Sequence, residues 1–192
     1  VSKMRHRNIV SVEDFGVTSS GLTFMVMELV EGRTLRWLIR RGGPLEPWRI
    51  ALFVRQMAEG RAEAHGRGFL HRDLKPSNVM VTEHEGADLL KILDFGLVRA
   101  QHQDDDEPWL TKTGQFVGTP TYMAPEQVSG TDVTALADLY ADGIMTYEML
   151  EGRPPFAAKR VVEMQRKHLF EVPTKPRDAH GLESLAMDLL EK

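Results

Sequence analysis

The chain contains no cysteine, no long apolar run and no large excess of charge of either sign. Without cysteine it can hold no disulfide framework, no thiolate nucleophile and no thiolate-bound metal. No apolar run approaches the roughly 18 residues that predict a membrane-spanning helix, and residues 1–5 lack the apolar stretch of a signal peptide. The net charge of −4 favours neither nucleic acid nor a membrane surface as a partner. We therefore expect a cytoplasmic chain without a membrane segment, although a membrane anchor could lie outside this segment.

What is present is the composition of an ordinary globular protein, 42% hydrophobic and 27% charged. Apolar residues over 9–15 and 22–29, on either side of a turn-forming Ser-Ser-Gly, predict a β-hairpin. Helical periodicity and capping residues predict helices over 35–41, 47–64, 133–150 and 157–170, and from 182 to the end. Two short strands are expected over 78–82 and 89–93, with an enlarged turn between them. This order predicts an α+β fold, with a hairpin followed by a helix-rich body.

The most specific pattern is a run of eight residues, His71-Arg72-Asp73-Leu74-Lys75-Pro76-Ser77-Asn78, which matches H-R-D-L-x-x-x-N at every fixed position. Asp94-Phe95-Gly96 and Ala124-Pro125-Glu126 follow in that order. Over nearly its whole length the chain resembles a eukaryotic-type protein kinase of the kind also found in bacteria. The resemblance implies a protein-kinase-like fold. Residues 1–30 would be the end of the small β lobe and the hinge, and residues 31–192 most of the helical large lobe, without its last helices.

The resemblance also implies which residues carry chemistry. Phosphoryl transfer requires an aligned hydroxyl, metal ions and positive charge near the transferred group. Asp73 would orient the hydroxyl or accept its proton, and Lys75 would contact the transferred phosphate. Asn78 and Asp94 would hold Mg²⁺ (or Mn²⁺) against ATP. Lys75 and Thr119 are, by the same resemblance, typical of kinases that phosphorylate serine and threonine.

An adenine site is implied next to the first hairpin. Met27 would take the gatekeeper position, and backbone groups of Glu28 and Val30 would meet the adenine edge. Met80 would form the apolar floor of the site. The alternative for the methionines is a plain packing role, since methionine fills irregular gaps in protein cores.

Regulation is implied by Arg72, which could bind a phosphate on the loop that precedes Thr119. Thr111 and Thr113 lie where related bacterial kinases phosphorylate themselves, which would require self-association; the alternative is that both are ordinary loop residues. Asp138 matches an aspartate that holds the catalytic loop. Asp142 stands where relatives usually have an apolar residue, and burial without a partner would destabilise the fold by about 1–3 kcal/mol.

The chain lacks three features of a complete kinase: a G-x-G-x-x-G loop, a V-A-I-K lysine and the glutamate that pairs with it. We therefore expect these 192 residues alone to be weakly active or inactive. Two hypotheses remain. In the first, the chain is part of a serine/threonine protein kinase that transfers the ATP γ-phosphate to protein hydroxyls. In the second, it is a truncated pseudokinase that acts as a protein-interaction module.

Overall fold

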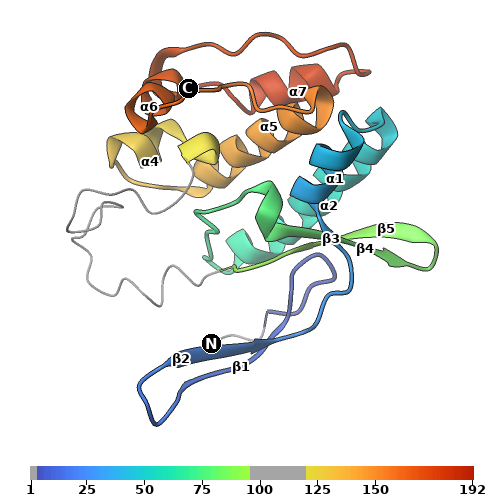
Figure 1. Ribbon diagram of the computed structural model, residues 1–192, viewed down its shortest axis with the longest axis vertical. Helices are drawn as coiled ribbons and strands as arrows, with labels where there is room; N and C mark the ends of the chain where they lie inside the picture. The colour runs from blue at the N-terminus through green and yellow to red at the C-terminus, as the bar shows by residue number, and fades with distance from the viewer. Residues whose placement is uncertain (1–3, 96–119) are drawn as a thin grey trace.

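The computed structural model describes residues 4–95 and 120–192, and it confirms the α+β prediction (Figure 1). Strands β1 (Val12–Val17) and β2 (Thr23–Met27) form an antiparallel hairpin at one end. Strands β3 (Arg33–Thr34), β4 (Val79–His84) and β5 (Ala87–Ile92) form a second antiparallel sheet. The helices are α1 (Leu35–Gly42), α2 (Pro47–Gly66), α4 (Pro125–Ser129), α5 (Ala135–Glu151), α6 (Val161–Phe170) and α7 (Leu182–Asp188), with 3-10 turns η1 (Pro76–Asn78) and η2 (Pro120–Tyr122).

Most helix boundaries follow from local capping chemistry. Thr34 Oγ1 accepts a hydrogen bond from Trp37 N at 3.2 Å, and this bond begins α1 as predicted. Gly152 ends α5 in the left-handed conformation, with φ 73°, which costs glycine little because it has no Cβ. Pro47 stands at the first position of α2, where a missing N–H removes no helical hydrogen bond.

The core lies where α2 and α5 meet the three-stranded sheet. Side chains from all three elements are fully buried there, among them Phe53 and Met57 of α2, Met145 and Met149 of α5, and Leu90 of β5. Burying large apolar side chains contributes about 1.5–3 kcal/mol each. Within the described residues, each helix is too short or too polar to cross a lipid bilayer.

A buried hydrogen-bond network joins the segment before β1 to this core. Asn8 Nδ2 donates to Gln56 Oε1 and to Leu90 O, both at 2.8 Å. Ile92 N donates to Asn8 O at 2.9 Å. A Cβ at Gly60 of α2 would lie 3.2 Å from Asn8 O, so glycine permits the close approach. The hairpin is thereby tied to the helical body at its base.

The predicted enlarged turn between β4 and β5 is wrong. The ladder continues through Glu83 opposite Asp88 and His84 opposite Ala87, which leaves only Glu85 and Gly86 in the turn. Both turn residues have positive φ, 52° and 77°, and two-residue turns of that kind match the twist of antiparallel strands. Polar residues are typical of loops, but here they belong to exposed strand ends.

Two helix predictions are also wrong at one boundary each. Helix α6 begins at Val161 rather than at residue 157. Phe156, just before the predicted start, is buried, and its ring centroid lies 5.1 Å from that of His168. The last helix ends at Asp188 and does not continue to the end of the chain.

Candidate functional site

The segment from His71 to Asn78 lies between α2 and β4, and its polar side chains converge on one carboxylate. Lys75 Nζ donates to Asp73 Oδ2 at 2.6 Å. Asn78 Nδ2 donates to the Asp73 carbonyl at 3.0 Å and lies 3.4 Å from Oδ2. The Asp73 side chain is still 47% exposed. The carboxylate is therefore positioned by neighbours and remains open to a molecule from solution.

Asp138 of α5 holds the backbone of this loop through hydrogen bonds, as its position in the sequence predicted. Its two oxygens accept hydrogen bonds from His71 N and Arg72 N, each at 2.9 Å. His65 Nε2 of α2 lies 2.7 Å from Oδ2. Asp138 is 1% exposed, and a buried carboxylate needs such partners to be tolerated.

Arg72 has a left-handed backbone, with φ 66°, which is uncommon for a residue other than glycine. Its N–H is held by Asp138, and its carbonyl accepts a hydrogen bond from Gln127 Nε2 at 2.7 Å. Gln127 Oε1 also accepts from Ala124 N at 3.0 Å. The strained peptide is thus fixed from both sides, and α4 is joined to the loop that carries Asp73.

His71 is best described as a neutral imidazole. Its Nε2 lies 2.8 Å from Leu93 O, which can only accept, while its Nδ1 accepts from Asp73 N at 3.3 Å. These partners assign the proton to Nε2. Burial lowers the pKa of His71, and the Asp138 charge opposes that shift. The ring packs edge-on against Phe95 at 4.9 Å, which links the loop to the residue after Asp94.

Asp94 and Asn78 lie at the same edge of the loop. Leu93 N donates to Asn78 O at 2.9 Å, so Asn78 sits beside the residue that precedes Asp94. Asp94 has a positive φ of 61°. The side-chain N–H of Asn78 donates to Asp73, and within the described residues no hydrogen bond is made by the side-chain oxygen Oδ1. An amide oxygen together with one carboxylate suits Mg²⁺. In the described residues, no cluster of three or more His, Asp or Glu could hold a metal ion.

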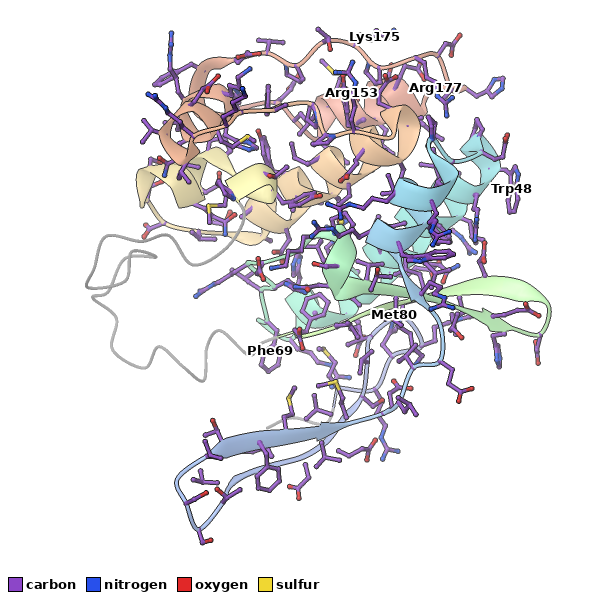
Figure 2. All side chains as sticks on the ribbon, viewed as in Figure 1. Trp48, Phe69, Met80, Arg153, Lys175 and Arg177 are labelled. Atoms are coloured by element: carbon purple, nitrogen blue, oxygen red, sulfur yellow. The ribbon has the colours of Figure 1, made fainter. Side chains whose placement is uncertain are left out.

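The expected adenine residues come from the end of the hairpin, the segment after it and the three-stranded sheet. Met27 ends β2 and is 39% exposed, and Glu28 and Val30 follow it. Met80 lies on the side of the sheet that faces the hairpin (Figure 2). It is opposite Lys91 in the ladder between β4 and β5.

Glu28 makes contacts that the sequence did not predict. Its carboxylate accepts from Lys91 Nζ at 2.7 and 2.9 Å and from Ser11 N at 2.8 Å. Burial alone would raise the pKa of Glu28, but the bonds from Lys91 and Ser11 outweigh it and lower the pKa. Glu28 therefore connects the residue just before β1 to β5, the strand that leads to Asp94.

A second buried pair lies one helical turn from Asp138. Arg61 Nη2 of α2 is 2.5 Å from Asp142 Oδ2 of α5, and the two side chains are 8% and 1% exposed. The two side chains form an ion pair, but the geometry of the contact is not that of a hydrogen bond. Within the described residues, both carboxylate oxygens of Asp142 and Nε of Arg61 have no hydrogen-bond partner. Burial raises the pKa of Asp142 to about 7, although Arg61 opposes the shift. The partner of Asp142, left open by the sequence, is Arg61.

Three of the predicted regulatory residues, Thr111, Thr113 and Thr119, lie outside the described residues. Sequence reasoning missed His65, Gln127, Lys91 and Arg61. One signal was available for two of them. On α2 the two basic residues Arg61 and His65 are four positions apart, and on α5 the same spacing separates Asp138 and Asp142. Equal spacing lets two packed helices form two pairs, one above the other: Arg61 with Asp142, and His65 with Asp138.

Replacing Asp138 with asparagine is expected to lower the free energy of unfolding by about 1–3 kcal/mol. The asparagine side chain has one acceptor oxygen, so one of the two loop N–H groups would face an amide N–H and stay unsatisfied. Urea unfolding would measure the loss, with Asp132→Asn, an exposed site just before α5, as the matched control. Equal midpoints for the two variants would contradict the anchoring role.

Comparison with known proteins shows the family of the chain. The model of the protein kinase domain family matches residues 1–192. The chain is 40% identical over 176 residues to serine/threonine-protein kinase pkn3 of Myxococcus xanthus, which covers 91% of this chain and 32% of pkn3. It is 40% identical to PkaA of Streptomyces coelicolor over 174 residues (91% and 31%), and 36% identical to PknB of Mycobacterium leprae over 189 residues (97% and 29%). The chain thus spans about a third of the length of these curated relatives. It belongs to the protein kinase domain family, among the bacterial serine/threonine kinases.

Proposed function

We propose that this chain forms the catalytic part of a protein kinase that transfers the ATP γ-phosphate to serine or threonine hydroxyls of proteins. The observation that carries the proposal is the convergence of Lys75 Nζ and Asn78 Nδ2 on Asp73, whose carboxylate stays open to solvent. The arrangement supplies an acceptor for a hydroxyl proton with a positive charge beside it. Positioning of this kind is the main catalytic contribution in phosphoryl transfer.

Each residue has a defined task in this proposal. Asp73 orients the substrate hydroxyl and takes its proton, and Asn78 fixes the Asp73 backbone. Lys75 lies 2.6 Å from Asp73 and can also reach the transferred phosphate, because its ammonium group ends a flexible stem. Asn78 Oδ1 and Asp94 would hold Mg²⁺ or Mn²⁺. When bound, that metal would neutralise charge on the ATP phosphates.

The nucleotide base is proposed to lie between the hairpin and the three-stranded sheet. Met27 and Met80 would contact its faces, and backbone groups of Glu28 and Val30 would bind its edge. We accordingly assign residues 1–30 to the end of a small lobe with its hinge, and residues 31–192 to the large lobe. The connection formed by Asn8, Gln56 and Leu90 would then join the two parts.

Regulation by phosphorylation is part of the proposal. Arg72 forms no ion pair with a described carboxylate, so its guanidinium can receive a phosphate on Thr111 or Thr113. Thr119 would contact Asp73 and Lys75. Transfer of a phosphate from one copy of the chain to another would require transient self-association. We place the reaction in the cytoplasm, where ATP is supplied.

The test is phosphoryl transfer by the full-length gene product. The protein would be incubated with γ-labelled ATP, Mg²⁺ and a general protein substrate, followed by phosphoamino-acid analysis. We expect label on serine and threonine, none on tyrosine, and none when Mg²⁺ is chelated. A well-folded gene product that binds partner proteins but transfers no phosphate would instead favour the pseudokinase hypothesis.

A further inference from the structure

The antiparallel pairing of β1 with β2 is altered just beyond its open end, at Ser11 and Glu28. Glu28 N donates to Ser11 O at 3.0 Å, which continues the register set by Val12 opposite Met27. Two residues paired in this way normally exchange both hydrogen bonds, so Ser11 N would be expected to donate to Glu28 O. Ser11 N donates instead to the side-chain oxygen Glu28 Oε1, at 2.8 Å. The carboxylate of Glu28 has therefore taken the place of the Glu28 carbonyl.

The exchange leaves the Glu28 carbonyl without a donor. Within residues 4–95 and 120–192, Glu28 O accepts no hydrogen bond, and the backbone N–H and C=O of Val30 are also unpaired. Both residues are half-buried, and backbone groups removed from water usually have a partner. The segment after β2 thus presents backbone groups that a bound molecule could pair with.

Lys91 of β5 holds the Glu28 carboxylate in this position. Lys91 Nζ lies 2.7 Å from Oε1 and 2.9 Å from Oε2 of Glu28, and the two side chains are only 16% and 30% exposed. Oε1 consequently accepts from both Lys91 Nζ and Ser11 N. Because an ion pair shielded from water is stronger than an exposed one, the charge of Lys91 keeps the carboxylate next to Ser11 N.

The same lysine lies beside the residue proposed as the floor of the adenine site. Lys91 is directly opposite Met80 in the ladder between β4 and β5. Side chains at directly opposite positions lie on the same face of a sheet, with Cβ atoms about 4.5–5.5 Å apart. That face is turned toward the hairpin, as the position of Met80 in Figure 2 shows. Lys91 therefore extends from the side of Met80 to Glu28.

The backbone could be satisfied without this arrangement. A bond from Ser11 N to the Glu28 carbonyl would complete the ladder and would require no ordered side chain. The observed arrangement orders a glutamate and a lysine, whose side-chain entropy opposes the pairing. What it adds is an unpaired carbonyl, and that difference is useful only to a molecule that brings its own donor.

We propose that Lys91, acting through the Glu28 carboxylate, is a positioning residue that keeps the Glu28 carbonyl free for the amino group of adenine. This inference rests on the proposed kinase function, in which backbone groups of Glu28 and Val30 bind the adenine edge. Adenine carries an amino donor at the ring position where guanine carries an acceptor oxygen. Lys91 thereby contributes to the selection of ATP over GTP.

Loss of the lysine charge is expected to restore the regular ladder. The Glu28 carboxylate is partly exposed, so without Lys91 it can turn toward water. Ser11 N would then donate to Glu28 O. Because the N–H and C=O of a paired strand residue point to the same neighbour, the carbonyl would face Ser11 and no longer the nucleotide.

The experiment measures nucleotide binding to the full-length gene product by isothermal titration calorimetry. The two ligands are ATP and purine riboside triphosphate, which differs from ATP only in lacking the amino group. We expect the wild type to bind ATP about tenfold more tightly, because the analogue leaves the carbonyl without a donor. Lys91→Met should reduce this ratio to about twofold or less. Lys91→Arg keeps the charge and the donor, so it should retain most of the ratio.

Two further variants separate this role from folding. Glu28→Ala removes the carboxylate and leaves Ser11 N to the carbonyl, so it should lose the ratio as Lys91→Met does. The matched control is Lys167→Met, which breaks the pair with Glu171 on α6 and should keep the full ratio. Thermal unfolding midpoints should change little in all four variants, because partly exposed ion pairs contribute little to stability.

Other outcomes would overturn the inference. Equal binding of both nucleotides by the wild type, or a folded Lys91→Met variant that keeps the full ratio, would refute it and leave the kinase function intact. Loss of the ratio in Lys91→Arg to the same extent as in Lys91→Met would also refute it, since the charge would then not be responsible. If the ratios follow the expectation but no phosphate reaches a protein, the inference holds and the kinase function is wrong. Absence of ATP binding would refute both.

Discussion

Replacing Asp73 with asparagine is expected to lower kcat for phosphoryl transfer about 10²–10⁴-fold. An asparagine keeps the size of the side chain but cannot take the hydroxyl proton or pair with the charge of Lys75. The KM for ATP should change little, because Asp73 is proposed to contact the hydroxyl and not the nucleotide. Steady-state kinetics of the full-length gene product would measure both constants.

Stability should distinguish this effect from misfolding. The Asp73 side chain is about half exposed, and its ion pair with Lys75 is near the surface, so the thermal unfolding midpoint should hardly move. Asp178→Asn, in an exposed loop, is the matched control and should keep full activity. If Asp73→Asn retained wild-type kcat, Asp73 would not be the group that handles the proton.

The largest effect on stability is expected at the buried pair of Arg61 and Asp142. Removing one partner leaves an uncompensated buried charge, so Arg61→Leu or Asp142→Leu should each lower the free energy of unfolding by about 3–5 kcal/mol. Replacing both with leucine should be neutral or stabilising, because an apolar pair needs no desolvation of charge. Urea unfolding of the wild type, both single variants and the double variant would measure the coupling.

The two single variants should differ in their dependence on pH. In Arg61→Leu the unpaired Asp142 can take up a proton, so the penalty should shrink between pH 8 and pH 5. In Asp142→Leu the unpaired Arg61 cannot lose its charge, so the penalty should persist at both values. As a control, the exposed pair of Arg55 and Glu59 should change stability by less than about 1 kcal/mol at either pH. Equal pH dependence in the two variants would contradict this account.

In the wild type, the titration of Asp142 should also make the free energy of unfolding depend on pH. Burial raises the pKa of Asp142 from 3.8 to about 7. Between these values the folded state binds more protons than the unfolded state, so the contribution of Asp142 to stability is complete below about pH 4 and falls as pH rises to about 7. The R61L/D142L variant should therefore gain more relative to wild type at pH 8 than at pH 5.

The sequence by itself determined the family and the loop that carries the chemistry. Asp73, Lys75 and Asn78 lie within six residues, so their encounter needs only a local turn. Helix α1 was equally predictable, because the Thr34 cap acts on a residue three positions away. Short-range chemistry of this kind is encoded in spacing, and spacing can be read directly.

Tertiary structure decided what holds that loop in place. Lys91 meets Glu28 across 63 residues, and Gln127 meets Arg72 across 55. The sequence left the partner of Asp142 open, and the packing of α2 on α5 places Arg61 beside it. Such pairs depend on the rotation and register of two packed elements, which no local pattern determines. The chemical groups could thus be found in the sequence, whereas their supports appeared only when the helices were packed.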